Sequence, residues 1–521
     1  MTNIETWEVR KPPIASKNGI VVTQHHRASQ IGAEVLAEGG NAVDAAIAAS
    51  FAIGVLEPWQ SGLGAIGHMV VAFANDTPYS IDFSARTPLQ LNPADYPLTG
   101  APGPSIFSWP GVQGDRNMEG PYSFGVPGQV AGTWLAHRKF GRMPWARLVA
   151  PAAQCAEEGL VVDWYWTFRI ASALRGLARY EHTASVYLPD GLVPSVDWRG
   201  GAVRLRPTRL ARTLRHIAEA GGDDFYRGDL AAAIAEDARS LGSSLTQADL
   251  RRYEPSLRAI DGVRYRDSTI FAASGLTAGP SLVQALGRFA ALTGRPGDLR
   301  SNAHVFPAIA ESLLRTYEER LANVESMSAD PAKATCTTQV SVIDREGNAV
   351  SLTQTLLQAF GSRVTLPETG ILMNNALMWF DPVPGKLNSI GPGRTPLSNV
   401  CPVVARTGDG GTIALGASGG RRIFPAVMQL LVFLIDRGMT LDEAVHHPRI
   451  DVSGDPWVVA DRYLPADALE ALGRKYEVRT EQNAVFPNYF ACANAVVRDG
   501  RSGVNHGAAY VVSPCAGAAS G

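Results

Sequence analysis

Thr337 heads a stretch whose residue types could perform acyl-transfer chemistry. A run rich in Thr, Val and Ile leads from it to Asp344, and a similar run follows a turn at 346–348, so the two predict a β-hairpin. If the bond after Cys336 is cut, the freed α-amine titrates near pH ~8 and can act as base for the threonine's own hydroxyl. The small and breaking residues of 326–333 predict a flexible loop that leads into this strand.

Threonine is common in strands, so a Thr337-Thr338 pair by itself most often marks a structural hairpin. A longer pattern changes that interpretation. Short blocks follow one another in order along nearly the whole chain, and as a set they resemble the γ-glutamyltransferase family of N-terminal-nucleophile hydrolases. Besides the hairpin, the blocks are 39–46, 61–64, 126–132, 225–228, 360–362, 370–375, 394–398 and 416–420.

The resemblance implies an α+β fold, the four-layer αββα sandwich of these hydrolases. It also implies that Thr337 first attacks the carbonyl of Cys336 and so cuts the chain into a large fragment, 1–336, and a small fragment, 337–521. The two fragments are expected to stay associated as one structural unit. The substrate class that follows is a small amide, hydrolysed through an acyl-enzyme without any cofactor.

Further site residues follow from the same comparison. Thr355 stands where the family has a second threonine that hydrogen-bonds the nucleophile, although a plain cross-strand threonine also fits. Gly419 and Gly420 lie between an expected strand and a helix, where outward-pointing N–H groups could form an oxyanion hole. Ser398 matches a serine that binds the substrate carboxylate.

The departures from the family pattern bear on the substrate. Where γ-glutamyl enzymes bind the α-carboxylate and α-amine of the donor, this sequence has Ser84, Leu357, Ala376 and Trp379. The second serine of a usual Ser-Ser pair is replaced by Asn399, while Arg86, two residues from the expected arginine, could still anchor a carboxylate. An ammonium group against Leu, Ala and Trp would lose its hydrogen bonds.

These differences favour an amidohydrolase for an acyl group without an α-amine, similar to oxamate amidohydrolase or the cephalosporin acylases. A γ-glutamyltransferase or glutathione hydrolase is the alternative. Two other classes stay open. The motif Gly416-Ala417-Ser418-Gly419-Gly420 fits the nucleophile elbow of a serine esterase, with His446, His447 or His506 as base, and a non-enzymatic scaffold could keep degenerate motifs.

The elements that must position these residues can also be expected. Periodicity predicts a helix over 28–38 and an almost wholly apolar, buried helix over 41–56 that stops at Glu57-Pro58. A glycine-rich turn at 61–67 should pack its backbone closely under the site. Further helices are expected over 210–220, 230–241 and 301–324, with strands dominating after Thr337 apart from helices at 425–437 and 441–446.

Composition limits the partners and the location. The chain has 521 residues with 47 Lys and Arg against 49 Asp and Glu, and no basic run, so a nucleic-acid partner is not expected. No signal-peptide pattern and no membrane span are visible, which predicts a cytoplasmic protein. The five cysteines lack ligand or disulfide spacing, so we expect no metal. Oligomerisation of the cleaved unit stays open.

Overall fold

A computed structural model describes residues 9, 11–74, 76–104, 109–196, 199–294, 299–322, 336–486 and 488–521. The loop expected over 326–333 and the end of the helix expected at 324 lie outside these residues. Among the described residues, no helix combines the length and the apolar character needed to cross a lipid bilayer.

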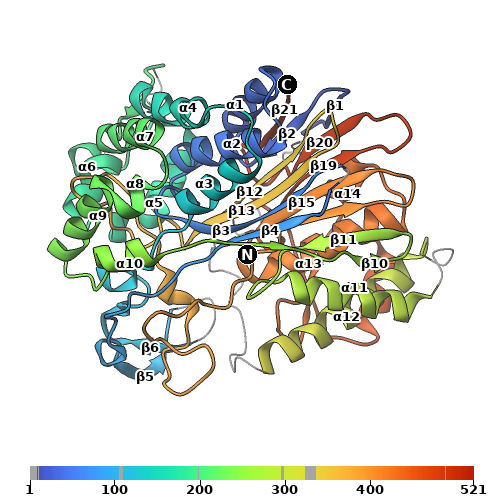
Figure 1. Ribbon diagram of the computed structural model, residues 1–521. Coiled ribbons are helices and arrows are strands. Elements are labelled where there is room, and N and C mark those ends of the chain that lie inside the picture. The colour runs from blue at the N-terminus through green and yellow to red at the C-terminus, as the bar shows by residue number, and fades with distance from the viewer. Residues whose placement is uncertain are drawn as a thin grey trace.

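Two seven-stranded sheets form the centre of the molecule (Figure 1). The hairpin sheet contains, in spatial order, β21 (Gly517–Ser520), β2 (Ile20–Thr23), β12 (Cys336–Ile343), β13 (Ala349–Leu357), β3 (Ile66–Ala72), β4 (Tyr79–Phe83) and β9 (Ser256–Ala259). The facing sheet contains β1 (Ile14–Ser16), β20 (Asn505–Ala509), β19 (Cys492–Arg498), β15 (Thr412–Ser418), β14 (Val403–Arg406), β11 (Ser268–Ala272) and β10 (Val263–Tyr265).

Helices cover the outer face of each sheet, one group at the upper left and the other at the lower right of Figure 1. The helices beside the hairpin sheet are α1 (His26–Ala37), α2 (Ala42–Leu56), α3 (Gln129–Phe140), α4 (Trp145–Glu158), α5 (Trp164–Leu177), α7 (Thr208–Ala220) and α9 (Asp229–Ser240). Those beside the facing sheet are α11 (Gly279–Thr293), α12 (Asn302–Ala322), α13 (Ile423–Leu431), α14 (Leu441–His446) and α15 (Ala466–Gly473). The expected four-layer αββα order is therefore present.

The period of two along each strand produces the three apolar layers between these elements. In β2, Val22 points into the core between the sheets, while its neighbour Val21 belongs to the core under α1 and α2. In β14, Val404 enters the core between the sheets and Val403 the core under α11 to α13. Each sheet thus buries apolar residues on both faces, as its place in the interior of a four-layer sandwich requires.

The segments before and after residue 337 both contribute strands to each of the two large sheets. In the hairpin sheet, β12 pairs with β2 on one side, and β13 pairs with β3 on the other. In the facing sheet, β1 pairs with β20, and β11 pairs with β14. Fragments produced by a cut at this point would share two continuous sheets, so they could not separate without breaking both.

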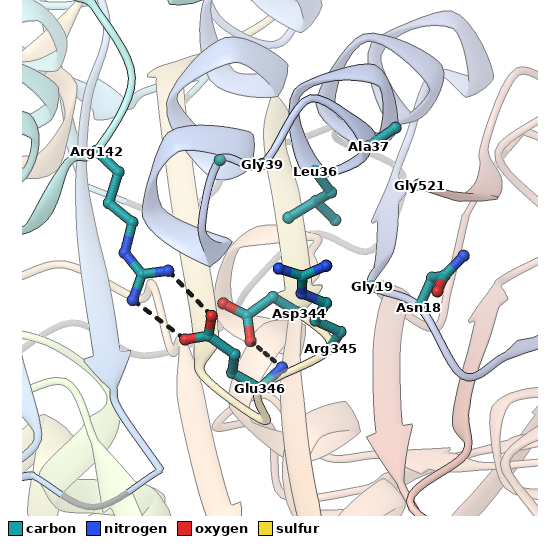
Figure 2. Close-up of a pocket in the computed structure, with 11 residues that line it drawn as sticks. Asn18, Gly19, Leu36, Ala37, Gly39, Arg142, Asp344, Arg345, Glu346 and Gly521 are labelled. Atoms are coloured by element: carbon teal, nitrogen blue, oxygen red, sulfur yellow. Dashed lines mark hydrogen bonds and ion pairs between the residues drawn. The ribbon is translucent and has the colours of Figure 1, made fainter.

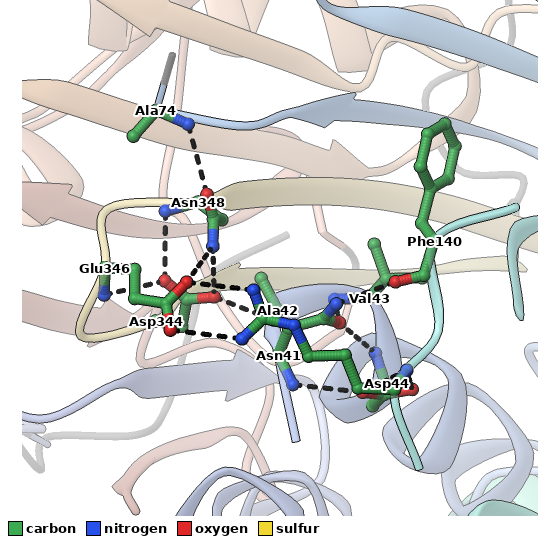
Figure 3. Close-up of polar contacts among 10 residues, drawn as sticks. Asn41, Ala42, Val43, Asp44, Ala74, Phe140, Asp344, Glu346 and Asn348 are labelled. Carbon is green, nitrogen blue, oxygen red and sulfur yellow. Dashed lines mark hydrogen bonds and ion pairs between the residues drawn. The ribbon is translucent and has the colours of Figure 1, made fainter. Parts of the chain in front are cut away.

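The turn of the β12–β13 hairpin is fastened to the start of α2 (Figure 3). Asp344 accepts hydrogen bonds from the backbone N–H groups of Ala42, Glu346 and Asn348 at 3.1, 2.9 and 3.0 Å. Asn348 in turn accepts from the backbone of Ala74 at 3.1 Å. Helix α2 begins with a capping box formed by Asn41 and Asp44. The hairpin that carries Thr337 is therefore held rigidly at its closed end.

The observed helices follow the expectations closely, with one difference. Helix α2 ends at Leu56 as expected, and its capping residue is Glu57. The helix expected over 425–437 instead runs as α13 to Leu431 and continues as a π-helical turn, Val432–Asp436. Apolar periodicity does not distinguish these two kinds of turn.

The remaining elements are short. Among the described residues, three small sheets consist of β5 (Leu98–Pro102) with β6 (Pro110–Val112), β7 (Leu160–Val161) with β8 (Arg204–Leu205), and β16 (Ile450–Asp451) with β17 (Val458–Asp461) and β18 (Val478–Glu481). The short α-helices are α6 (Glu181–Tyr187), α8 (Asp224–Arg227) and α10 (Gln247–Arg252).

Candidate active site

Thr337 lies at an irregularity of the hairpin. The pairing between β12 and β13 shifts at this point, because Cys336 is opposite Leu357 while Thr338 is opposite Gln354. Thr337 therefore has two residues, Thr355 and Leu356, across from it. A bulge of this kind bends a strand and re-aims its side chains, and such bulges are common beside reaction centres.

The hydroxyl groups of Thr337 and Thr355 lie 3.3 Å apart, with Thr337 Oγ1 donating. Thr355 Oγ1 in turn donates to the carbonyl oxygen of Cys336, the residue before the expected cut. Both threonines are buried. The result is a chain of two hydroxyl groups that starts at the expected nucleophile and ends at the carbonyl that it would attack.

The strand end that holds Thr355 is strained. Leu357 has a φ of 84°, which is uncommon for a residue with a branched side chain. Its backbone N–H donates to Thr355 Oγ1 at 2.8 Å. This bond directs the Thr355 lone pair, so that the hydroxyl proton points to the carbonyl of Cys336. Strained backbone of this type tends to cluster at functional sites.

A glutamine from the turn after α2 contacts the nitrogen of Thr337. Gln60 Oε1 accepts a hydrogen bond from the Thr337 N–H at 3.2 Å, and Gln60 Nε2 donates to Glu57 Oε2 at 3.2 Å. Glu57 has no solvent exposure, and burial raises its pKa to about 8. Neither side chain was predicted to be part of the site from the sequence, in which Glu57 only marks the end of the helix.

Cys336 is held by a buried arginine. Arg169 of α5 donates from Nη2 to Cys336 Sγ at 2.9 Å, and its guanidinium lies over the rings of Trp59 and Tyr165. Burial raises the pKa of the Cys336 thiol, so the thiol stays protonated. The residue on each side of the expected cut is therefore fixed by a polar contact.

The glycine-rich turn packs closely against this site, as expected. A Cβ atom added to Gly67 would lie 2.2 Å from the carbonyl oxygen of Thr353, and one added to Gly64 would lie 2.2 Å from the carbonyl oxygen of Leu372. Neither position has space for a side chain, so glycine is required at 67 for β3 to lie against β13 and at 64 for the turn to lie against the segment at Leu372.

Gly419 and Gly420 lie at the same end of the sheets as Thr337. A Cβ atom added to Gly416 would overlap Gln339 of β12, and Ser418 accepts a hydrogen bond from Gln24. The end of β15 therefore lies beside the start of β12, where Thr337 is located. Among the described residues, neither glycine forms a hydrogen bond with Thr337, so their use as oxyanion donors stays a prediction.

Trp379, Leu357 and Ala376 belong to one buried apolar cluster beside the hairpin end. Leu357 brings the cluster to the site, because it pairs with Cys336. The three positions that correspond to the ammonium-binding residues of γ-glutamyl enzymes are thus part of a continuous apolar wall. The cluster consists of Ile66, Ala85, Trp109, Met118, Leu357, Ala376, Met378, Trp379 and Val400.

Ser398 and Arg86 lie on neighbouring segments. Arg86 donates to Thr395 Oγ1, three residues before Ser398. Ser398 Oγ accepts from the backbone N–H of Val400 at 3.2 Å, which leaves its hydroxyl proton available to a ligand. Ser84, at the position of the family arginine, shares a 2.8 Å hydrogen bond with His68 instead.

A partly buried arginine that no sequence pattern singled out holds the same segment. Arg320 Nη2 donates to the carbonyl oxygen of Ser398 at 2.6 Å and to Asn399 Oδ1 at 3.4 Å. Its Nη1 donates to Thr277 O at 3.0 Å and Ser281 Oγ at 3.1 Å. Asn399 thus contributes to the shape of this segment through Arg320.

The geometry does not support Ser418 as an esterase nucleophile. Its hydroxyl contacts Gln24, and none of the three histidines bonds to it within the described part of the chain. Ser418 pairs with Cys492, whereas His506 pairs with Val497, five residues or about 17 Å further along β19. His446 is bonded to Asp442 on its own helix.

Comparison with known proteins gives the family of the chain. A sequence profile described as gamma-glutamyltranspeptidase matches residues 28–332 and 316–509. The chain belongs to the γ-glutamyltranspeptidase family. The chain is also 31% identical over 510 residues to the acylase ACY 1 proenzyme of Pseudomonas sp. strain SE83, covering 91% of this chain and 90% of that protein.

Other members of the γ-glutamyltranspeptidase family are almost as similar. The glutathione hydrolase proenzyme of Pseudomonas sp. strain A14 is 29% identical over 509 residues, covering 88% of this chain and 85% of that protein. The crystal structure of cephalosporin acylase from Bacillus halodurans superposes with a TM-score of 0.83 over 100% of this chain and 99% of that one, at 24% identity. The fold is therefore that of the N-terminal-nucleophile hydrolases, and the protein is an amidohydrolase of the acylase or γ-glutamyltranspeptidase kind.

A pocket of about 230 Å³ lies at the opposite end of the hairpin (Figure 2). It is lined by Arg142, Asp344 and Glu346 among others, and Arg142 forms a two-point ion pair with Glu346. Seven residues of strand, about 23 Å, separate Asp344 from Thr337. Arg142, Asp344 and Glu346 are occupied in contacts that hold the hairpin turn, and the pocket is not part of the reaction site. Among the described residues, no group of three or more His, Cys, Asp and Glu could hold a metal ion.

Proposed function

We propose that this protein cuts itself between Cys336 and Thr337 and then hydrolyses a small amide with Thr337 as its N-terminal nucleophile. The observation that supports this most strongly is the chain of hydroxyl groups from Thr337 through Thr355 to the carbonyl of Cys336. A structural threonine pair has no need of a bond to the preceding carbonyl.

The self-cleavage step can be written with each atom accounted for. Thr337 Oγ1 attacks the carbonyl carbon of Cys336, its proton moves to Thr355, and the Thr355 proton moves to the carbonyl oxygen. The C–N bond then breaks, the nitrogen takes the proton that the hydroxyl of the intermediate releases, and the acyl group is left as an ester on Thr337. Water hydrolyses the ester and leaves a carboxylate on Cys336 and a free amine on Thr337.

The same groups then serve turnover. The α-amine of Thr337 removes the hydroxyl proton, the alkoxide attacks the substrate amide, and the proton passes to the leaving amine. The backbone N–H groups of Gly419 and Gly420 would stabilise the oxyanion. A second water releases the acid. Thr355 orients the nucleophile in both reactions, whereas its contact with the Cys336 carbonyl exists only before the cut.

The proposed acyl group carries a carboxylate and no α-amine. The apolar wall that contains Leu357, Ala376 and Trp379 offers an ammonium group no acceptor. Ser398 and Arg86 lie on adjacent segments and provide donors for a carboxylate. The glutathione hydrolases among the relatives make a γ-glutamyl donor the alternative, and it has the same carboxylate with an added amine.

Measurement of the intact mass tests the proposal at its first step. Purified wild-type protein should give two masses that correspond to 1–336 and 337–521, and Thr337→Ala should give one uncut chain without amidase activity. An uncut wild-type protein that hydrolyses amides, or an active Thr337→Ala variant, would overturn the assignment of Thr337.

A further inference from the structure

The α-nitrogen of Thr337 already has a hydrogen-bond acceptor directed at it. Gln60 Oε1 accepts from this nitrogen at 3.2 Å, and the other end of the same amide donates to Glu57 at 3.2 Å. An amide side chain has one acceptor end and one donor end. If the Gln60 amide turned over, its NH₂ group would face the N–H of Thr337. Glu57 therefore determines which end of Gln60 meets the nucleophile.

Glu57 is an unusual residue for such a place. The backbone of Gln60 donates to the carbonyl of Glu57 at 2.9 Å, so the turn after α2 closes without the carboxyl group. The side chain has no solvent exposure, and its Oε1 atom has no hydrogen-bond partner among the described residues. Burying a carboxyl group with half of its acceptors unused is costly. A turn or a helix cap alone does not require it.

Three charged side chains act on the carboxyl group of Glu57. They are Arg169 of α5, Lys11 of the N-terminal segment and Asp163 at the start of α5. Burial exceeds the effect of the two cations and raises the pKa of Glu57 to about 8. A neutral carboxyl group can accept from Gln60 without adding a negative charge near the α-amine. A full negative charge there would stabilise the ammonium form and remove the base.

We propose that Gln60 and Glu57 are positioning residues for the general base: Glu57 fixes the amide of Gln60, and Gln60 fixes the α-amine of Thr337. With one N–H held by Gln60 Oε1, the amine lone pair is turned towards the threonine's own hydroxyl. This inference rests on the proposed function, in which that amine is the base. It adds two residues that the sequence analysis did not connect with catalysis.

The test uses the cleaved enzyme with glutaryl-p-nitroanilide and records kcat and KM against pH. Gln60→Leu should lower kcat by about 10²-fold with KM changed less than threefold, because the base is no longer oriented. Glu57→Met should have a similar but smaller effect, and Glu57→Gln, which keeps an acceptor for Gln60, should restore kcat to within about threefold of wild type.

An exchange variant tests the same pair without changing its volume. Glu57→Gln combined with Gln60→Glu restores the contact between the two side chains but places the carboxylate next to the α-amine. Because a neighbouring negative charge favours the ammonium form, the acid limb of kcat/KM should move to higher pH by about one unit or more. Arg169 and Lys11 stay in place, so the cationic background is the same.

Gln429→Leu is the matched control. Gln429 is also a fully buried glutamine, with bonds to Pro425 and Ile450 in α13 and β16. It should lower the thermal midpoint while leaving kcat and the pH profile unchanged.

The outcomes separate the inference from the proposed function. If wild type is cut, Thr337→Ala is inactive, and Gln60→Leu and the exchange variant both keep the wild-type kcat and pH profile, the positioning role is wrong and the nucleophile stands. If Thr337→Ala is active, both are wrong.

Discussion

Thr355 Oγ1 lies between the hydroxyl of Thr337, 3.3 Å away, and the carbonyl oxygen of Cys336, to which it donates. One side chain thus contacts both atoms that must react when the chain is cut. The bulge between β12 and β13 makes this possible, because it places Thr355 and Leu356 together across from Thr337. A regular ladder would give Thr337 a single residue across from it.

Replacement of Thr355 should affect cleavage and turnover together. Thr355→Ala removes the relay to the Cys336 carbonyl and the orienting bond to Thr337, so both rates should fall by about 10²–10³-fold. Thr355→Ser keeps the hydroxyl and should stay within about tenfold of wild type. The appearance of the small fragment by mass and kcat on the cleaved enzyme give the two rates. An alanine variant with full rates would show that Thr355 is only a strand residue.

A matched pair of substrates tests the acyl pocket. Glutaryl-p-nitroanilide and γ-glutamyl-p-nitroanilide differ only in the α-amine, so any difference in kcat/KM comes from that group. Since the wall around Leu357, Ala376 and Trp379 has no acceptor for an ammonium, the glutaryl compound should be preferred by about 10–100-fold. A γ-glutamyl donor that is equal or better would restore the γ-glutamyltransferase alternative.

Ser398 should contribute to binding only when the substrate carries a carboxylate group. Ser398→Ala removes one hydrogen bond to a charged group, and KM for glutaryl-p-nitroanilide should rise by about 10–30-fold with little change in kcat. For butyryl-p-nitroanilide, which has no carboxylate, wild type and variant should have the same KM. An equal loss on both substrates would mean that the substitution only disturbs the segment that Arg320 holds.

Stability should depend on pH through Glu57. Its folded-state pKa of about 8 lies above the ordinary value of 4.5, so between these values the folded chain binds a proton that the unfolded chain has lost. This group therefore favours folding below about pH 4.5 and disfavours it progressively as the pH rises towards 8, by about 1.4 kcal/mol per pH unit. The thermal midpoint of Glu57→Gln should exceed that of wild type increasingly from pH 5 to pH 8. A constant difference across this range would contradict the raised pKa.

Much of the fold could be predicted from the sequence because it depends on local patterns. The apolar helix α2, its stop at Glu57 and the hairpin with its turn at 346–348 are all visible as periodicity and turn residues. The four-layer arrangement came from the ordered motifs and is confirmed by the structure. The esterase alternative depended on a short motif, and within the part of the chain that the structure describes Ser418 has no histidine partner.

The remaining features of the site depend on contacts between distant segments. The bulge at Thr337 is a matter of register, which alternation along one strand does not specify. Gln60 and Thr337 are 277 positions apart in the sequence, and Arg320 contacts Ser398 from helix α12. A glutamate directly after an almost wholly apolar helix is the one signal that could have been used, because a carboxyl group there has little chance of reaching water.

Trapping the acyl-enzyme shows which residue of the cleaved protein is the nucleophile. The cleaved protein, mixed with glutaryl-p-nitroanilide and quenched in acid within one turnover, should carry one glutaryl group. Peptide mapping should place it on the first residue of the small fragment, Thr337, and the adduct should be absent from Thr337→Ala. An adduct on any other residue, Ser418 included, would show that Thr337 is not the nucleophile.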